Sequence, residues 1–165
     1  MPATYEPIAT YTAPSAQASY TFSSIPSTYT DLVLVSNAIL ASGGAANLWC
    51  RFNGDTGGTA NYSTTYLAGN GSAASSARDT SAAEGWCGRL SSTNWTTSIA
   101  SFQNYANSTT YKTSISRGND VSGLVIAYAS LWRQTTAISS ITLSNSSGIN
   151  FSAGSTFTLY GIKAA

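Results

Sequence analysis

The sequence predicts an all-β fold: a jelly-roll-like antiparallel β-sandwich that forms a single domain over residues 1–165. No segment shows sustained helical periodicity, whereas short runs alternate apolar and polar residues with the period of two that marks a β-strand. Clusters of Gly, Asn, Ser and Thr separate these runs, as turns do between strands. The length suits one domain, and no change of composition divides the chain.

The first strands are expected near the N-terminus. Residues 1–12 form either an N-terminal arm or the first strand, with the strand itself at residues 5–12, and residues 19–22 form the next. Later segments alternate so that each is expected to be a strand with one buried face; they are residues 48–52, 95–99, 111–115, 141–143 and 157–160. Residues 41–47 and 68–77 are rich in Gly, Ser and Ala and are expected to be long loops.

Two further runs, residues 31–36 and 123–132, are apolar on both faces. A strand of this kind in an antiparallel protein must have its second face covered. In residues 123–132 that face holds Val125, Ala127, Ala129 and Leu131, and the small alanines allow close approach. The sequence does not decide whether another subunit or the loops of the chain itself cover this face.

Composition limits the partners. Only 8% of the residues are charged and the net charge is +1, so no basic field holds nucleic acid or an anionic membrane. The longest apolar run has about half the length that a membrane-spanning helix needs, and no secretory signal stands at the N-terminus. We therefore expect neither nucleic acid nor membrane as a partner, and synthesis in a cytoplasm. The many Tyr and Trp and the few Lys and Glu are typical of protein interfaces.

The chain has few of the titratable residues from which catalytic sites are formed. It has no histidine, and its six acidic residues are scattered singly, so neither a catalytic triad nor a carboxylate pair is expected. A serine–lysine pair with Lys112 or Lys163 is formally possible, but no nucleophile motif accompanies either lysine. We expect a protein that is not an enzyme, with no cofactor and no metal site.

Two short features have both a structural and a chemical interpretation. Asn53 and Asp55 begin a pattern like a calcium loop, but the later acidic ligands are missing, and turn formation explains the glycines better. Cys50 and Cys87 cannot complete a zinc site without histidine or further cysteines. They are expected to be two free buried thiols, with a disulfide as the less favoured alternative in a reducing cytosol.

Six segments carry a resemblance that covers almost the whole chain. They are residues 25–35 (IPSTYTDLVLV), 51–57 (RFNGDTG), 66–71 (YLAGNG), 103–112 (QNYANSTTYK), 132–143 (WRQTTAISSITL) and 154–163 (GSTFTLYGIK). With them the chain resembles small virion proteins of tailed phages, especially cyanophages, that serve as capsid cement or decoration proteins or recur as modules of tail fibres.

The resemblance implies a jelly-roll β-sandwich, commonly trimeric, on the capsid shell, and it implies no catalytic residue. The expected function is that of a non-enzymatic decoration protein on the virion surface, with the major capsid protein and its own copies as partners. The alternative is a tail-fibre or spike module that binds host polysaccharide through exposed Tyr and Trp. A start at Met1 without a stalk favours the first.

The predicted contact residues follow from patterning. The seam between subunits is expected at Val125, Ala127, Ala129 and Leu131. The contacts with the shell are expected in residues 2–12 and at loop arginines, namely at Tyr5, Glu6, Arg51 and Arg133.

Overall fold

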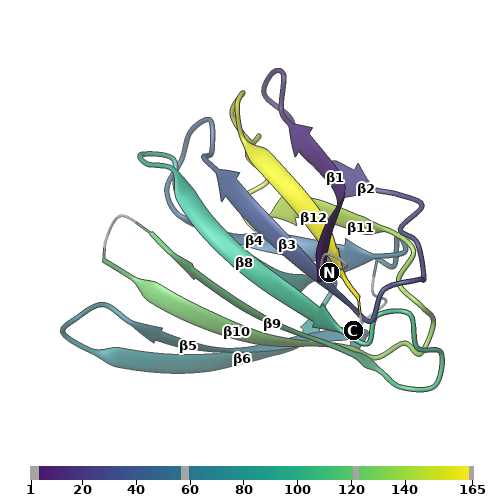
Figure 1. Ribbon diagram of the computed structural model, residues 1–165. Helices are drawn as coiled ribbons and strands as arrows, with labels where there is room; N and C mark the ends of the chain where they lie inside the picture. Colours follow the sequence, from purple (N-terminus) through teal and green to yellow (C-terminus); the bar gives the residue numbers. More distant parts are fainter. Residues whose placement is uncertain (1–3, 57–59, 121–122, 164–165) are drawn as a thin grey trace.

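Two antiparallel β-sheets pack face to face in this chain (Figure 1). The computed structural model describes residues 4–56, 60–120 and 123–163. The elements of regular secondary structure along these residues are β1 to β12, all of them strands. The prediction of an all-β, jelly-roll-like β-sandwich in a single domain is confirmed.

The strands follow one another along the chain as β1 (Tyr5–Thr12), β2 (Tyr20–Phe22), β3 (Asp31–Ala38), β4 (Ala46–Phe52), β5 (Tyr62–Gly69), β6 (Ala74–Ala82), β7 (Gly85–Leu90), β8 (Thr96–Gln103), β9 (Lys112–Asn119), β10 (Val125–Trp132), β11 (Ile141–Asn145) and β12 (Thr156–Ile162). The large sheet has the order β1-β12-β3-β8-β9-β10-β5-β6, and the small sheet has the order β2-β11-β4-β7. All strand pairs are antiparallel.

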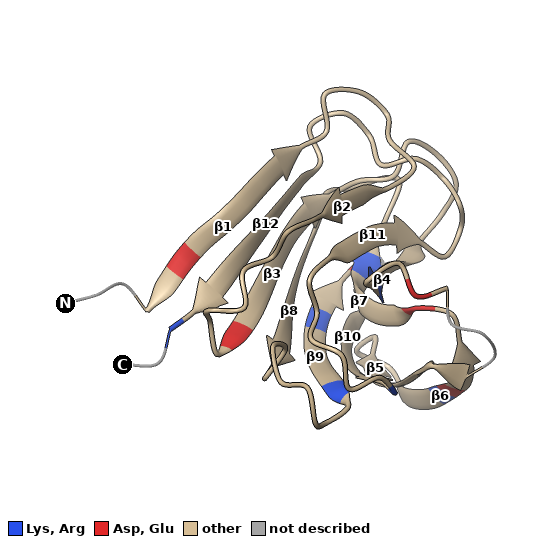
Figure 2. Cartoon of the chain, turned by 90° about the vertical axis from the view of Figure 1, so that its right-hand side faces the viewer, with Lys and Arg blue, Asp and Glu red and all other residues tan. Residues whose placement is uncertain are grey.

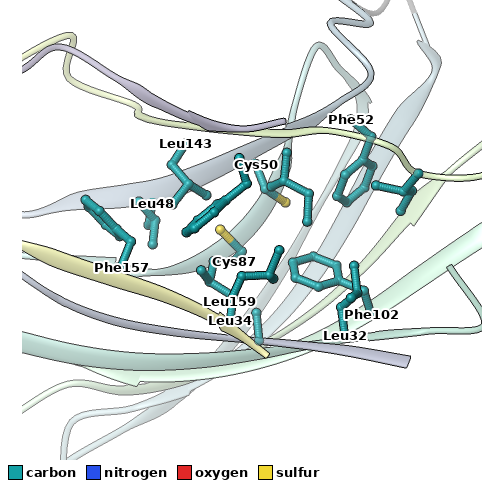
Figure 3. Close-up of a cluster of buried hydrophobic side chains, with 14 of the residues drawn as sticks. Leu32, Leu34, Leu48, Cys50, Phe52, Cys87, Phe102, Leu143, Phe157 and Leu159 are labelled. Carbon is teal, nitrogen blue, oxygen red and sulfur yellow. The ribbon is translucent and has the colours of Figure 1, made fainter. Parts of the chain in front are cut away.

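The small sheet lies against one face of the large sheet, whose β5–β6 end curls toward the edge strand β7 (Figure 2). Strand β7 contacts β5, β8, β9 and β10 of the large sheet. Apolar side chains from both sheets fill the space between them (Figure 3). The large sheet contributes Leu32, Leu34, Phe102, Phe157 and Leu159, and the small sheet contributes Leu48, Cys50, Phe52, Cys87 and Leu143.

Each of the segments that the sequence predicted as strands contains one, but β5, β6 and β7 were not predicted. The expected loop at residues 68–77 is wrong, because residues 68–69 belong to β5 and residues 74–77 to β6, and only the short turn between them connects the β5–β6 hairpin. Its turn is closed by the side chain of Asn70, whose Oδ1 accepts from the amides of Ser72 (3.0 Å) and Ala73 (2.8 Å). Strand β6 is exposed along most of its length, so it has no apolar alternation for a sequence pattern to detect. A search of the described residues for a helix able to span a membrane found none.

Strand β9 buries a polar face, and β8 buries a face that is polar at Thr96 and Ser98 but apolar at Ala100 and Phe102. Ser98, Ser114 and Ser116 point into the sandwich, whereas Ile115 is 61% exposed on the opposite face. The reason is the close approach of β7. A Cβ atom at Gly88 would lie 2.6 Å from the Ser98 Cβ, so a side chain at position 88 would collide with Ser98.

Hydroxyl groups of the large sheet also satisfy the backbone of β7, which is an edge strand of the small sheet. The Ser98 hydroxyl accepts from the Arg89 amide (3.1 Å) and donates to the Arg89 carbonyl (3.5 Å). The Ser130 hydroxyl does the same for Trp86, at 3.1 Å in both directions. Serine can do this because one hydroxyl both donates and accepts. Backbone groups that would otherwise be unpaired at a buried sheet edge are thereby satisfied.

We expect Ser98→Ala to lower the free energy of unfolding by about 1–3 kcal/mol, because it leaves the buried amide and carbonyl of Arg89 without their partner. Urea denaturation followed by circular dichroism measures the change. Ser101→Ala is the matched control, since Ser101 is on the opposite face of the same strand and is only half-buried. Equal effects of the two substitutions would contradict the role assigned to the Ser98 hydroxyl.

Candidate functional site

The first candidate site is the outer face of the large sheet, which points away from the small sheet. The predicted seam residues of β10 lie on it: Val125 is 64% exposed, Ala127 and Ala129 are exposed, and Leu131 is half-buried. Loops from the described part of the chain leave these side chains open to solvent. The sequence left two alternatives for what covers this face, another subunit or the chain's own loops. The second alternative is therefore wrong for this strand.

Neighbouring strands extend this apolar surface. Leu67 on β5 lies opposite Ala127 and is 66% exposed. Ile115 on β9 lies opposite Ala129 and is 61% exposed. We refer to Leu67, Ile115, Val125, Ala127, Ala129 and Leu131 as the outer patch.

The outer patch is bordered by positive charge. Arg117 lies opposite Ala127 on β9, and Arg78 lies on β6 opposite Thr65. Arg78 and Thr65 line a hollow of about 470 Å³ together with patch residues. None of the six acidic residues of the chain is on the outer face of β5, β6, β8, β9 or β10 in the described structure.

The predicted shell contacts do not form one surface. Tyr5 and Glu6 are on β1, the edge strand of the large sheet, where Tyr5 is 58% exposed. Glu6 accepts from Lys163 (2.7 Å) and Tyr29 (3.3 Å), and these interactions hold the pKa of its carboxyl below the ordinary value. Residues 2 and 3 of the expected contact segment lie outside the described residues.

The two arginines of that set are on other parts of the molecule. Arg51 is on β4 of the small sheet and forms an ion pair with Glu84. Arg133 follows β10 and donates from Nη1 to the carbonyl of Ala60 (2.6 Å). In the large sheet β10 is separated from β1 by β12, β3, β8 and β9, so Tyr5 and Arg133 are far apart.

A second candidate site is a pocket on the inner side of the β5–β6 hairpin, of about 320 Å³. The pocket is lined by residues of β4, β5, β6, β7 and β10 and by the residue that precedes β10. They are Asn47, Tyr66, Ala68, Ser75, Trp86, Arg89, Leu124 and Ile126. No pattern in the sequence predicted this pocket. A β-bulge in the pairing of β7 with β4 breaks the alternation of β7, so that Cys87 and Gly88 are both buried and the strand pattern is lost.

The pocket has an aromatic side and a polar side. Trp86 stacks on Tyr66, with ring centres 6.0 Å apart and planes 26° apart. On the polar side, Arg89 donates from Nε to Asp120 (3.1 Å) and from Nη1 to Oδ1 of Asn47 (3.1 Å). The Tyr128 hydroxyl donates to the same Oδ1 (2.9 Å), and burial raises its pKa, so the hydroxyl keeps its proton.

The titratable groups that a catalytic mechanism would need are dispersed. Figure 2 shows charged positions spread over both sheets. No group of three or more His, Cys, Asp or Glu that could hold a metal was found among the described residues. Lys112 donates from Nζ to the carbonyls of Thr110 and Thr135, both at 2.8 Å, and Lys163 pairs with Glu6. Neither lysine hydrogen-bonds to a serine hydroxyl in the described structure.

The glycine loop that resembles a calcium site uses its oxygens internally. Oδ1 of Asn53 accepts from the amides of Ser139 (2.8 Å) and Ser140 (3.1 Å). Asp55 accepts from the indole of Trp132 (2.7 Å). These contacts agree with the turn interpretation, and residues 57 and 58 of the loop lie outside the described residues.

Cys50 and Cys87 are free and buried in the core between the sheets (Figure 3). The Cys50 thiol donates to the carbonyl of Gly85 (3.5 Å). Burial is the main cause that raises the pKa of the Cys87 thiol, which lies beside Cys50. Both residues act as small apolar side chains of the core.

No protein-family model matches the chain, and no curated protein matches it. Among solved structures, it is similar to domains LG4-5 of the mouse laminin alpha1 chain, with 15% identity and a TM-score of 0.34 over 91% of this chain. The chain spans only 40% of that laminin chain. Similarity at this level says nothing about what this chain binds or catalyses.

Two other solved structures are similar at a comparable level. The alginate lyase Aly36B, in a mutant form with an alginate tetrasaccharide, has 11% identity and a TM-score of 0.33, covering 83% of this chain and 72% of that one. A protein of unknown function from Shewanella oneidensis MR-1 has 12% identity and a TM-score of 0.26, covering 98% and 77%.

We expect both thiols to be slow to react with Ellman's reagent at pH 8 in the folded protein, because both are buried away from the reagent and because burial raises the pKa of the Cys87 thiol. After unfolding in guanidinium without a reductant, two thiols per chain are expected to react at least about ten times faster. Absorbance at the wavelength of the released thiolate follows the reaction. No reaction after unfolding would mean that the two cysteines form a disulfide.

Proposed function

We propose that this chain is a non-enzymatic virion protein of a tailed phage: a decoration protein that binds the outer surface of the assembled capsid and stabilises contacts between capsomers. It is made in the host cytoplasm and acts as a homotrimer on the capsid surface, with the major capsid protein as its partner. The proposal of a virion protein and of a trimer rests on the resemblance described above. The outer patch supports assembly through a sheet face.

The observation that carries the proposal is the exposure of the outer patch. Six large hydrophobic residues are exposed in the described structure, and three of them, Leu67, Ile115 and Val125, belong to this patch. Contiguous exposed apolar surface marks sites of protein interaction. At its centre, Ala127 and Ala129 have short side chains that allow another backbone to approach closely.

The charges around the patch favour a cyclic trimer over a two-fold dimer. In a two-fold dimer the same surface from both copies meets, so Arg78 and Arg117 would enter the interface twice with no acidic residue from that surface to pair with them. In a cyclic trimer the patch meets a different surface of the next copy. Like charges therefore need not face each other.

A trimer would bind the shell through three equivalent contacts at once. Linked contacts gain avidity even when each one is weak, which suits attachment to a repeating capsid lattice. Tyr5 is the best placed of the four expected shell residues, because it is exposed at the edge of the large sheet. Glu6, Arg51 and Arg133 have partners within the chain, so they would contribute as rim groups.

We expect the double variant Ala127→Glu and Ala129→Glu to be monomeric, since two longer, charged side chains would block the close approach at the alanines and lose their hydration in the seam. Sedimentation velocity measures the oligomeric state. The matched control is Thr21→Glu, on an exposed position of the small sheet, which should leave the trimer intact. An unchanged oligomer in the double variant, or a wild-type chain that is already monomeric, would contradict the seam.

We expect an antibody against this chain to label the head of intact virions, as seen by negative-stain electron microscopy. A preparation in which the antibody is first saturated with the purified chain serves as the control. Label confined to the tail would support the alternative instead, a receptor-binding module for host polysaccharide. Absence of label from intact and disrupted virions alike would contradict both.

A further inference from the structure

We propose that the pocket between the β5–β6 hairpin and β7 binds one uncharged pyranose ring of a glycan. This binding function is independent of the outer patch, because the pocket lies on the opposite face of the same hairpin. The proposed sugar binding is compatible with a location of the chain on the phage head or on the phage tail. Its volume of about 320 Å³ is at the small end of ligand pockets, which fits one ring rather than a long chain.

The aromatic side of the pocket offers a surface for the apolar face of a sugar. Trp86 and Tyr66 are half-buried and stacked, so part of each ring remains accessible. Tyr128 is buried and meets Trp86 edge to face, with ring centres 5.8 Å apart. The CH groups of a pyranose carry partial positive charge, and such groups pack on the negative face of an aromatic ring.

The polar side offers mainly donors. Oδ1 of Asn47 already accepts from Arg89 and Tyr128, which fixes the orientation of its amide. The Asn47 Nδ2, the Arg89 Nη2 and the Ser75 hydroxyl have no hydrogen-bond partner within the described structure. A pyranose carries hydroxyl and ring oxygens around its whole edge, so it presents acceptors to donors at several positions.

The charge balance of the pocket favours an uncharged sugar. Arg89 is the one charged residue among the lining residues described, and its ion pair with Asp120 neutralises it. The Asp120 side chain is only 3% exposed, so this pair is held within the protein and is weakly screened by salt. An acidic sugar would have to compete with that carboxylate for the same guanidinium.

The site is also held in place before any ligand arrives. The Ser130 hydroxyl binds both backbone groups of Trp86, and Ser98 binds both backbone groups of Arg89. The aromatic and the polar side are therefore anchored to the large sheet through the same strand. Preorganisation of this kind lowers the entropic cost of binding.

The test is a titration of the full chain, labelled with ¹⁵N, with methyl α-D-glucopyranoside, methyl β-D-galactopyranoside and methyl α-D-mannopyranoside. The indole resonance of Trp86 reports binding by NMR. We expect it to shift saturably with at least one of the three, with a Kd on the order of 1 mM. The indole of Trp95, which is 51% exposed outside the pocket, is the internal control and should not shift.

Two variants of β6 separate the pocket from the rest of the surface. Ser75→Trp fills the pocket and should weaken binding at least about tenfold. Ser76→Trp places the same side chain on the opposite face of the strand and should leave the Kd unchanged. Both positions are exposed, so both variants are expected to fold.

Three results would overturn the proposal. They are no saturable shift of Trp86 with any of the three glycosides, equal shifts of Trp86 and Trp95, or equal Kd values for the two tryptophan variants. A shift with the methyl α-glycoside of D-glucuronic acid, which carries a free carboxylate, and with none of the three neutral glycosides would overturn the proposal of an uncharged ligand. None of these results bears on the trimer, whose test depends on Ala127 and Ala129.

Discussion

The structure depends on how the edge of β7 is satisfied. Within the described residues, this strand ends the small sheet and has no neighbouring strand on its free side, yet it is packed against the large sheet. Serine hydroxyls of β8 and β10 take the place of that neighbour by binding both backbone groups of Arg89 and of Trp86. The junction of β7 with the large sheet is therefore polar at these two serines, and it includes a position with no room for a side chain, Gly88.

This junction accounts for the outer patch. The inward positions of β9 after Lys112 are small, at Ser114, Ser116 and Gly118, and the one apolar residue of that strand, Ile115, occupies an outward position. In β10 both faces are apolar, and the inward face alone supplies the core with Tyr128 and Trp132. The outward face then remains as surface that a partner could cover. It is the physical basis of the proposed assembly.

The same junction creates the pocket. Holding β7 by its free edge leaves the β5–β6 hairpin projecting beyond it, and Trp86 and Arg89 line the space between. The hairpin thus carries Leu67 of the outer patch on its outer face, and its inner face contributes Tyr66, Ala68 and Ser75 to the pocket. The two faces are suited to different partners, a protein surface on one side and a small polar ring on the other.

The sequence by itself determined the all-β fold, the strands with apolar alternation, and the common face of Val125, Ala127, Ala129 and Leu131 on β10. These features are local, because the period of two and the turn residues are properties of short segments. Only the tertiary structure decided which face of β8 and β9 is buried, since the proximity of Gly88 to Ser98 comes from strands of different sheets. It also decided the pocket, because Tyr66, Trp86 and Arg89 meet through long-range packing and a β-bulge that no local pattern encodes.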